Sequence, residues 1–321
     1  MANGGPRIGV VGATGAVGTV TLELLAERGY AGVRAFASER SAGRAVTYGS
    51  DTLVVEEATP EALGAGDLDL CLFSVGAAAS RELVPVARAA GAVCVDKSAA
   101  YRLTPGVPLV VPEVNGDRAR DHDGIVANPN CCSIPLSCAL KPLHDAAGLT
   151  GVQVATYQSA SGAGAHRMEL LCAERPEDHD LATDWSFDGV EFEEESKLRE
   201  ETRKILELPE LPISATCVRV PVLVGHAEAV WVELDRPLTS HEARDVLAAA
   251  PAIRVEEFPT PGMAAGTNEV LVGRIRQDSA QSGSAQTELA LFVVCDNLRK
   301  GAALNAIQIA ELLLERRPVA A

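Results

Sequence analysis

Positive charge is scarce in this sequence. Lysine and arginine total 28 against 44 aspartate and glutamate residues, which gives a formal net charge of −16. Because binding to nucleic acid phosphates needs a basic face, this balance argues against a nucleic acid partner. It is compatible with an anionic small molecule, since such a ligand needs only a few local arginines.

Long apolar runs and metal-type cysteine clusters are also missing. No uninterrupted apolar run is long enough to cross a bilayer, so we expect no membrane-spanning helix. The start, Met1–Gly5, shows no basic region followed by an apolar core, and we expect no signal peptide. The eight cysteines form no CxxC pair and no cluster with histidine at zinc spacing. We therefore expect free thiols, no metal and a cytoplasmic location.

A chain of 321 residues is long for a single hydrophobic core, and its hydrophobic pattern changes midway. The first half alternates apolar strands with helical patterns, which is typical of a parallel, doubly wound sheet. The strands expected there are Ile8–Val11, Val33–Ala37, Leu68–Phe73, Val93–Asp96 and Leu109–Val111. The second half predicts a mainly antiparallel sheet with strands at Val152–Ser159, Val270–Arg276 and Leu289–Val294, and a loop at Gln277–Ala285. The acidic stretch Glu174–Glu201 indicates a solvated face.

A glycine loop follows the first strand. Gly12, Gly15 and Gly18 stand between that strand and an amphipathic helical pattern. Glycines allow a tight turn and a close approach to phosphates, and the helix start supplies N–H donors. The loop therefore predicts a dinucleotide site, in a GxxGxxG variant of the usual spacing.

The end of the second strand bears on which dinucleotide binds. Ser38, Arg40 and Ser41 are suited to the extra phosphate of NADP, whereas Glu39 keeps open a contact with the ribose of NAD. The balance favours NADP. Ser74 and Gly76 follow another strand, at the edge where ligands bind in such sheets.

The chain is organised around Asn128–Pro135, where two cysteines precede a helical pattern. Free backbone N–H groups and the helix dipole favour a thiolate there, so Cys131 is a candidate nucleophile. Burial of both cysteines as small hydrophobes is the alternative. His226 follows a glycine and is the best candidate for an acid/base, although a structural histidine is also possible from this segment alone. Arg102 is either an anion contact or a surface arginine.

Taken together, the segments resemble aspartate-semialdehyde dehydrogenase, the phosphorylating NADP enzyme family of the aspartate pathway. The resemblance runs nearly end to end. Its markers are GATGAVG, SERSAG, FSVG, AAYRL, VPEVN, NPNC, TYQSASGAG, EESK, RVPVLVGH, VGRIR and DNLRKGAALNAIQIAE.

The resemblance implies a role for each matching residue. The catalytic residues are Cys131 as nucleophile, His226 as acid/base and Gln158, which orients the acyl intermediate. The substrate-binding residues are Arg102 and Lys197 for phosphate, Arg219 for the carboxylate, Glu194 for the amino group, and Asn130 in the same pocket. The residues expected at the cofactor are Gly12, Ala13, Thr14, Gly15, Ala16, Val17, Ser38, Arg40, Ser41, Ser74, Gly76, Ser161, Gly162 and Asn297.

The resemblance also implies an architecture and a reaction. A Rossmann-like NADP-binding domain (1–130 and 300–321) is combined with an α+β catalytic and dimerisation domain (131–299), and the protein forms a homodimer. NADPH-dependent reduction of aspartyl phosphate to aspartate semialdehyde passes through a cysteine thioester and feeds lysine, diaminopimelate, threonine and methionine biosynthesis. The alternatives are N-acetyl-γ-glutamyl-phosphate reductase and a non-catalytic binding paralogue. Arg219 with Glu194 argues against the first, and intact Cys131 and His226 argue against the second.

Two positions depart from the family pattern. Cys132 stands where the family often has serine, and Pro135 where glutamine is common. Pro135 should be mild in its effect, because a proline in the first helical turn removes no needed N–H. The place of Cys131 directly after Asn128–Asn130 favours it over Cys132 as the nucleophile.

Overall fold

The computed structural model describes residues 5–173, 185–280 and 286–314 of the chain. The chain divides into two compact units, Met1–Pro129 with Ala302–Ala321, and Asn130–Gly301. Parts of the acidic stretch and of the loop expected at 277–285 lie outside the described residues. None of the described helices is long and apolar enough to span a bilayer.

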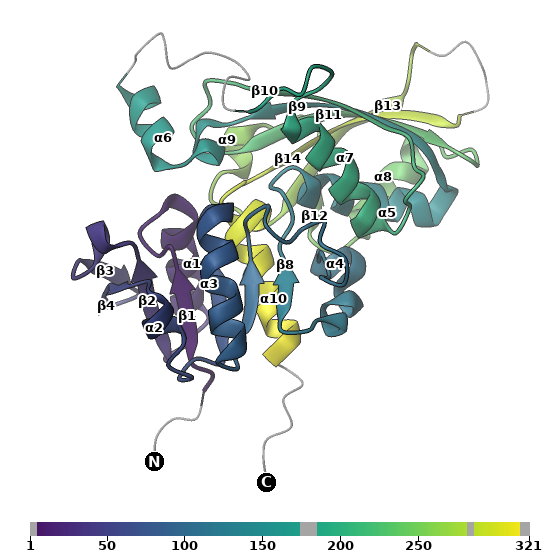
Figure 1. Cartoon of the computed structure of the whole chain (residues 1–321). Helices are drawn as coiled ribbons and strands as arrows, with labels where there is room; N and C mark the ends of the chain where they lie inside the picture. Colours follow the sequence, from purple (N-terminus) through teal and green to yellow (C-terminus); the bar gives the residue numbers. More distant parts are fainter. Residues whose placement is uncertain (1–4, 174–184, 281–285, 315–321) are drawn as a thin grey trace. The chain divides into compact units, whose positions relative to one another are not determined.

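The first unit is built on a six-stranded parallel sheet (Figure 1). Its strands are β1 (Ile8–Val11), β2 (Val33–Ala37), β5 (Glu56–Glu57), β6 (Leu70–Phe73), β7 (Val93–Asp96) and β8 (Ile125–Ala127). They lie in the order β5-β2-β1-β6-β7-β8, and a separate hairpin is formed by β3 (Ala45–Tyr48) and β4 (Asp51–Val54). Every residue of β1 and β6 is buried, which explains why these strands are continuously apolar.

Helices cover both faces of this sheet. On one face, α1 (Ala16–Glu27) and α10 (Leu304–Leu314) bury Leu25 and Ile307 against Val10. On the other face, α2 (Pro60–Leu63) contributes Leu63 and α3 (Ala77–Ala89) contributes Leu83 to a core that contains Phe73. Two clusters on opposite faces are what a doubly wound sheet requires, and the expected Rossmann-like fold is confirmed.

One expected strand of the first unit is wrong. Leu109–Val111 was expected as a full strand, but only Leu109 forms a bridge, to Ala127. Pro108 precedes the segment and Pro112 begins the short helix α4 (Pro112–Asn115), which is followed by η2 (Gly116–Asp121). A proline lacks the N–H that a ladder needs and pushes the residue before it out of the helical region, so the two prolines confine the segment to a few residues.

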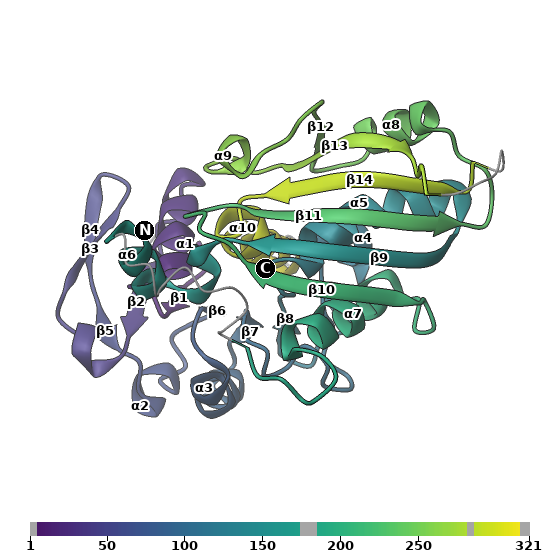
Figure 2. The same cartoon turned by 90° about the horizontal axis from the view of Figure 1, so that it is seen from above.

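The second unit contains a six-stranded mixed sheet (Figure 2). Its strands are β9 (Leu149–Gln158), β10 (Ile213–Arg219), β11 (His226–Leu234), β12 (Ile253–Val255), β13 (Val270–Gln277) and β14 (Glu288–Cys295). The order is β10-β9-β11-β14-β13-β12. The three central pairings are antiparallel and the two outer ones are parallel, so the expected mainly antiparallel sheet is confirmed.

One face of this sheet packs against helices. The layer consists of α5 (Ser133–Ala147), α7 (Glu193–Leu206) and α8 (Ser240–Ala248). The shorter elements of the unit are η3 (Ala160–Ala163), α6 (Ala165–Cys172) and α9 (Pro261–Ala264), and the π-helical η5 (Arg299–Ala303) precedes α10. Strand residues alternate between the two faces, so Val154 and Val230 are buried while Tyr157 on the other face is 39% exposed.

Candidate active site

Cys131 lies in the turn immediately before α5, whose first helical residue is Ser133. The turn is shaped by Asn130, whose side-chain oxygen accepts the backbone N–H of Cys132 at 2.8 Å. Cys132 is the N-cap of the helix and is 1% exposed, whereas Cys131 is half-buried. The more accessible sulfur therefore stands at the positive end of the α5 dipole. Pro135 falls in the first turn, as expected.

His226 begins β11 and is brought next to these sulfurs. The sulfur atoms of Cys131 and Cys132 and a ring nitrogen of His226 all lie within 4.8 Å of one another. Nδ1 of His226 accepts the backbone N–H of Ser159 at 3.0 Å, so the neutral ring holds its proton on Nε2. Nε2 has no hydrogen-bond partner among the described residues. The ring is thus oriented by the backbone, with a donor left for chemistry.

Gly162 allows the loop after β9 to pass directly against this ring. A Cβ built on Gly162 would lie 2.9 Å from both Cε1 and Nε2 of His226, and 3.3 Å from Nη1 of Arg219. Side chains do not tolerate such short contacts, so the position is restricted to glycine. The sequence places Gly162 among the residues expected at the cofactor. Within the second unit, its close neighbours are His226 and Arg219, two of the candidate site residues.

Asn297 joins the same loop to the turn before His226. Its side-chain oxygen accepts the hydroxyls of Ser159 and Ser161, each at 3.0 Å, and the backbone N–H of Gly225 at 2.9 Å. Ser159, Ser161 and Asn297 are all buried, with at most 3% of each residue exposed. Ser161 and Asn297, which were expected at the cofactor, are therefore held together by a buried hydrogen-bond network.

Arg219 ends β10 directly beside Gln158, which ends β9. Its Nη1 donates to the carbonyl oxygen of Ser159 at 2.8 Å, and its guanidinium lies 4.9 Å from the centre of the Trp185 ring. The turn between β10 and β11, with Gly225 at a φ of +101°, returns the chain so that His226 and Arg219 both reach the same loop. The sequence leaves two places for a bend that turns Arg219 and His226 toward one pocket, Pro221 and Gly225.

Glu194 lies in the first turn of α7 and is 6% exposed. Its Oε1 accepts the amide groups of Asn130 at 2.8 Å and of Gln158 at 3.0 Å. Three residues expected in one pocket are therefore joined by direct hydrogen bonds. The expectation of a solvated acidic face is wrong for Glu194 and also for Glu195 and Glu201, which are buried because their carboxylates accept N–H groups of neighbouring segments.

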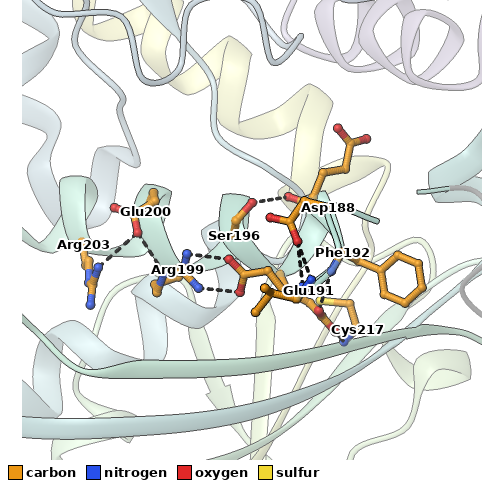
Figure 3. A network of polar contacts seen from close by, with 11 residues as sticks. Asp188, Glu191, Phe192, Ser196, Arg199, Glu200, Arg203 and Cys217 are labelled. Atoms are coloured by element: carbon orange, nitrogen blue, oxygen red, sulfur yellow. Dashed lines mark hydrogen bonds and ion pairs between the residues drawn. The ribbon is translucent and has the colours of Figure 1, made fainter. Parts of the chain in front are cut away.

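The start of α7 is held in place by further polar contacts (Figure 3). Glu195 accepts the backbone N–H of Phe192 at 2.8 Å and that of Cys217 in β10 at 3.0 Å, which ties the helix to the sheet. Arg199 pairs with both carboxylate oxygens of Glu191 at 2.6 and 2.7 Å, and this hydrogen bonding lowers the pKa of Glu191. These contacts hold the first turn of α7 in place and therefore also orient the side chain of Glu194, which lies on the same turn.

Lys197 lies one turn further along α7. Its ammonium group pairs with Glu193, four residues earlier, at 3.1 Å. The side chain is 26% exposed, so the ammonium remains close to solvent. Such an exposed pair contributes little to stability and can be exchanged for another anion.

The glycine loop of the first unit has the expected form. Gly12 has a φ of +88°, and a Cβ there would lie 2.4 Å from the carbonyl oxygen of Ser74. A Cβ on Gly18 would lie 2.1 Å from the carbonyl oxygen of Gly12. The loop passes Ala13 and Thr14, with Gly15 as the N-cap, and α1 starts with Ala16 and Val17. Close packing of loop, strand and helix leaves the first N–H groups of α1 directed out of the loop.

The remaining candidate cofactor residues follow the ends of β2 and β6, on either side of β1. Ser38 and Arg40 are exposed, and Thr14 donates to Ser41 at 3.3 Å across the two loops. The Ser74 hydroxyl is buried and has no hydrogen-bond partner among the described residues. Gly76 is the N-cap of α3, so a second helix start lies at this edge of the sheet.

Arg102 lies in the loop that follows β7 in the first unit. Its Nε donates to the carbonyl oxygen of Asn128 at 3.0 Å and its Nη2 to that of Lys97 at 2.6 Å. Two backbone carbonyls therefore orient the guanidinium. Lys97 itself is half-buried, and the desolvation of its amine lowers the pKa of that group to about 7.

One buried residue of the second unit, Glu228, is not identified by the sequence analysis. Glu228 is two positions after His226 in β11, so the alternation of strand residues places both side chains on the face that carries α5. It is 1% exposed, and burial raises its pKa well above the ordinary 4.5. Burial also raises the pKa of Cys132, whose thiol contacts Glu228. The signal in the sequence was the period of two in His226-Ala227-Glu228.

The chain matches two family models. Residues 7–122 match "Semialdehyde dehydrogenase, NAD binding domain" and residues 140–300 match "Semialdehyde dehydrogenase, dimerisation domain". These matches and the geometry above define the class as the semialdehyde dehydrogenases.

Relatives narrow the class further. The aspartate-semialdehyde dehydrogenase of Corynebacterium melassecola is 44% identical over 96% of this chain and 99% of its own length. That of Bacillus subtilis is 38% identical over 96% and 97%. The crystal structure of aspartate semialdehyde dehydrogenase II from Vibrio cholerae superposes with a TM-score of 0.91 at 36% identity, covering 98% of this chain and 99% of that one. The chain belongs to the aspartate-semialdehyde dehydrogenase family, as the sequence motifs had indicated.

Proposed function

We propose that this chain catalyses the NADPH-dependent reductive dephosphorylation of L-aspartyl 4-phosphate to L-aspartate 4-semialdehyde in amino-acid biosynthesis. The observation that carries the proposal is the placement of Cys131 and His226, whose sulfur and ring nitrogen lie within 4.8 Å at the start of α5. Relatives of the same length carry this activity in their names, and one Vibrio cholerae structure is described as complexed with ASA.

Cys131 is the nucleophile in this proposal. The helix start favours its thiolate, which attacks the acyl carbon of the substrate and expels phosphate to leave a thioester. A thioester accepts hydride where a free carboxylate would not, and NADPH supplies that hydride when it is bound. Collapse of the resulting hemithioacetal releases the aldehyde and regenerates the thiolate. Cys132 is less suited to attack, because burial raises its pKa and keeps it a thiol.

His226 acts through Nε2. Because the N–H of Ser159 occupies Nδ1, the neutral ring presents Nε2–H as a hydrogen-bond donor. That donor stabilises the Cys131 thiolate before attack and the negative oxygen of the tetrahedral species afterwards. This assigns His226 the donor half of the acid/base role. The N–H of Cys132, a further candidate donor to that oxygen, is already bonded to Asn130.

The remaining polar residues of the second unit hold the substrate. Arg219, fixed between a backbone carbonyl and Trp185, matches the two oxygens of a carboxylate. Glu194 takes the ammonium group of the substrate. The side-chain amides of Gln158 and Asn130 donate to the Glu194 carboxylate and orient it. Lys197 holds the phosphate by exchanging its partner Glu193. The family resemblance assigns Arg102 to phosphate as well, and two backbone carbonyls orient its guanidinium.

The cofactor assignment rests on the first unit. A loop in which added Cβ atoms would collide, followed by the start of α1, fits a dinucleotide pyrophosphate. Arg40 and Ser38, both exposed after β2, are placed for the 2′-phosphate of NADP. A structure of the Candida albicans enzyme, 27% identical with a TM-score of 0.74, is described as containing NADP.

We further propose that the protein is a cytoplasmic homodimer. The face of the second sheet opposite α5, α7 and α8 carries Tyr157 and Phe292, with ring centres 6.3 Å apart, and Arg274 lies 5.4 Å from the Phe292 ring centre. Aromatic and arginine side chains are the ones enriched at protein interfaces. No disulfide joins any of the eight cysteines, all of which lie in the described residues, and this fits a reducing compartment.

The test is phosphate-dependent reduction of NADP⁺ with aspartate semialdehyde, run in parallel with N-acetylglutamate semialdehyde. We expect turnover with the first aldehyde and little with the second. Preference for the acetylated aldehyde would assign the chain to N-acetyl-γ-glutamyl-phosphate reduction. Absence of turnover with either aldehyde, in protein shown to be folded, would indicate a binding paralogue.

A further inference from the structure

We propose that Trp185 is a specificity-determining residue for the free carboxylate of the substrate, and that it acts through the contact of its ring with the Arg219 guanidinium. The proposal deepens the proposed function and rests on it for the identity of the substrate. Trp185 lies outside the sequence motifs that resemble the family, and the resemblance gives it no role.

The first step is the state of the Arg219 guanidinium. The residue is 5% exposed, and its Cζ lies over the Trp185 ring, 4.9 Å from the ring centre. Its Nη1 donates to the carbonyl oxygen of Ser159 at 2.8 Å. Both of these neighbours are neutral, so they orient the guanidinium without neutralising its charge. A guanidinium that is buried and oriented in this way is suited to the two oxygens of a carboxylate.

The second step is what the Trp185 ring adds. The face of an indole attracts a cation, and the attraction is stronger when the cation is removed from water. The contact also holds a long side chain in one orientation, so less conformational entropy is lost when a carboxylate binds. Loss of the ring should therefore weaken carboxylate binding and leave the chemistry at Cys131 nearly unchanged.

The position of the Trp185 ring is set by a short hairpin, residues 185–192, which we call the aromatic hairpin. The ring packs edge-on against Phe192 with ring centres 6.4 Å apart, and the Phe187 ring centre lies 5.3 Å from that of Phe192. The backbones of Phe187 and Phe192 form an antiparallel bridge. Aromatic pairs of this kind contribute stability beyond their buried area. The half-buried tryptophan is thus held by its own hairpin.

The turn of the aromatic hairpin is closed by its own polar contacts (Figure 3). The side chain of Asp188 accepts the backbone N–H of Glu191 at 2.9 Å, and the N–H of Asp188 donates to the carbonyl oxygen of Glu191 at 3.2 Å. Gly189 has a φ of +103°, a conformation that side chains rarely adopt. The hairpin is therefore a defined element of the second unit.

The aromatic hairpin runs directly into α7 and the ammonium site. The N–H of Glu193 donates to the carbonyl oxygen of Ser186 at 2.9 Å, and Glu194 is the next residue. Glu194 accepts the amide of Gln158, which is the register partner of Arg219. One element thus supports the group proposed for the ammonium and the ring that contacts the group proposed for the carboxylate. A substrate with both groups on one carbon is the α-amino acid type.

Fluorescence tests the contact without turnover. The chain has two tryptophans, so Trp231→Phe in β11 leaves Trp185 as the reporter. The probe is L-2-aminobutyrate, which has the carbon chain, ammonium and carboxylate of aspartate semialdehyde but no aldehyde. Its amide, which lacks the carboxylate, is the matched control. We expect a saturable change in Trp185 emission with the acid and none with the amide at the same concentration. An equal response to both probes, or no response to the acid, would overturn the proposal.

Substitutions of Trp185 separate the aromatic face from packing alone. Trp185→Ala and Trp185→Leu should weaken L-2-aminobutyrate, measured by calorimetry, roughly 2–30-fold, whereas Trp185→Phe keeps a ring and should retain most of the affinity. The KM for aspartate semialdehyde should rise by the same factor with kcat nearly unchanged, because a contact remote from the reacting carbon binds ground state and transition state alike. Trp231→Phe is the control and should change neither value.

Full affinity in Trp185→Leu would overturn the role of the aromatic face, and this variant remains informative if Trp185→Ala does not fold. The inference and the proposed function fail separately. Binding of L-2-aminobutyrate that depends on Trp185, in a chain without turnover, would remove the reaction and keep this site. An unchanged KM in Trp185→Ala, in a chain that turns over aspartate semialdehyde, would remove the role of Trp185 and keep the reaction.

Discussion

Gly162 and His226 are in direct contact, and the contact leaves no room for a side chain at position 162. A Cβ at this position would lie 2.9 Å from the ring atoms Cε1 and Nε2. The loop after β9 therefore determines where the imidazole donor points, and the rest of the site depends on that direction.

Gly162→Ala tests this contact. The methyl group must displace either the loop or the ring, and a misplacement of about 1 Å can cost on the order of 100-fold in rate. We expect kcat to fall roughly 10–100-fold. The control is Gly262→Ala in α9, where no atom lies within 4 Å of the added Cβ. Full activity in Gly162→Ala would mean that the ring position is not set by this loop.

The two adjacent sulfurs can be separated by mutation. Cys131→Ala should lower turnover below about one thousandth, since removal of a nucleophile costs several orders of magnitude. Cys132→Ser should keep most of the activity, because its buried thiol is not the attacking group. Steady-state kinetics with aspartate semialdehyde measure both. The reverse pattern would transfer the nucleophilic role to Cys132.

Arg40 is predicted to distinguish the two nicotinamide cofactors. A hydrogen bond to a charged partner is worth about 1.5–3 kcal/mol, so Arg40→Ala should weaken NADP binding roughly 10–150-fold. NAD, which lacks the 2′-phosphate, should bind almost as before. The neighbouring exposed Arg44 gives the matched control, Arg44→Ala. Equal losses for both cofactors in Arg40→Ala would remove the 2′-phosphate role.

Glu228 predicts a pH dependence of stability. Burial raises the pKa of Glu228 in the folded protein above its ordinary 4.5, so between those two values the folded state holds a proton that the unfolded state has lost. The free energy of unfolding should therefore fall as pH rises through this window, by up to about 1.4 kcal/mol per pH unit from this group.

Glu228→Gln removes this titration and keeps the shape of the side chain. We expect the variant to be more stable than the unmodified protein at pH 7, with a smaller loss of stability between pH 5 and 7. Urea unfolding at a series of pH values measures the difference. A variant that is less stable at neutral pH, with an unchanged slope, would show that the carboxylate is ionised and paired.

Local patterns in the sequence were sufficient for much of the fold. Val33–Ala37 and Val93–Asp96 are strands with the expected bounds, because continuous apolar runs between turns leave few alternatives. Leu109–Val111 satisfies the same pattern and still fails as a strand, since the prolines on either side allow only one bridge. The composition of a run does not show whether a partner strand can pair with it.

The site was predictable to a lesser extent. Cys131 carries a local signal, because a cysteine before a helix start can be recognised from the sequence alone. The hydrogen bond between Ser159 and Asn297 joins residues 138 positions apart, and only the family resemblance placed Asn297 in the site. The burial of Glu228 and the contact of Trp185 with Arg219 also depend on long-range packing. No spacing rule in a single sequence reports such contacts.

The central claim is that Cys131 forms a thioester that phosphate then cleaves. Rapid mixing of the enzyme with aspartate semialdehyde and NADP⁺ in the absence of phosphate tests this directly. The account predicts a burst of about one NADPH per chain, with the acyl group on Cys131 by mass spectrometry, and steady turnover only after phosphate is added. Steady turnover without a burst, or an acyl group on any other residue, would contradict it.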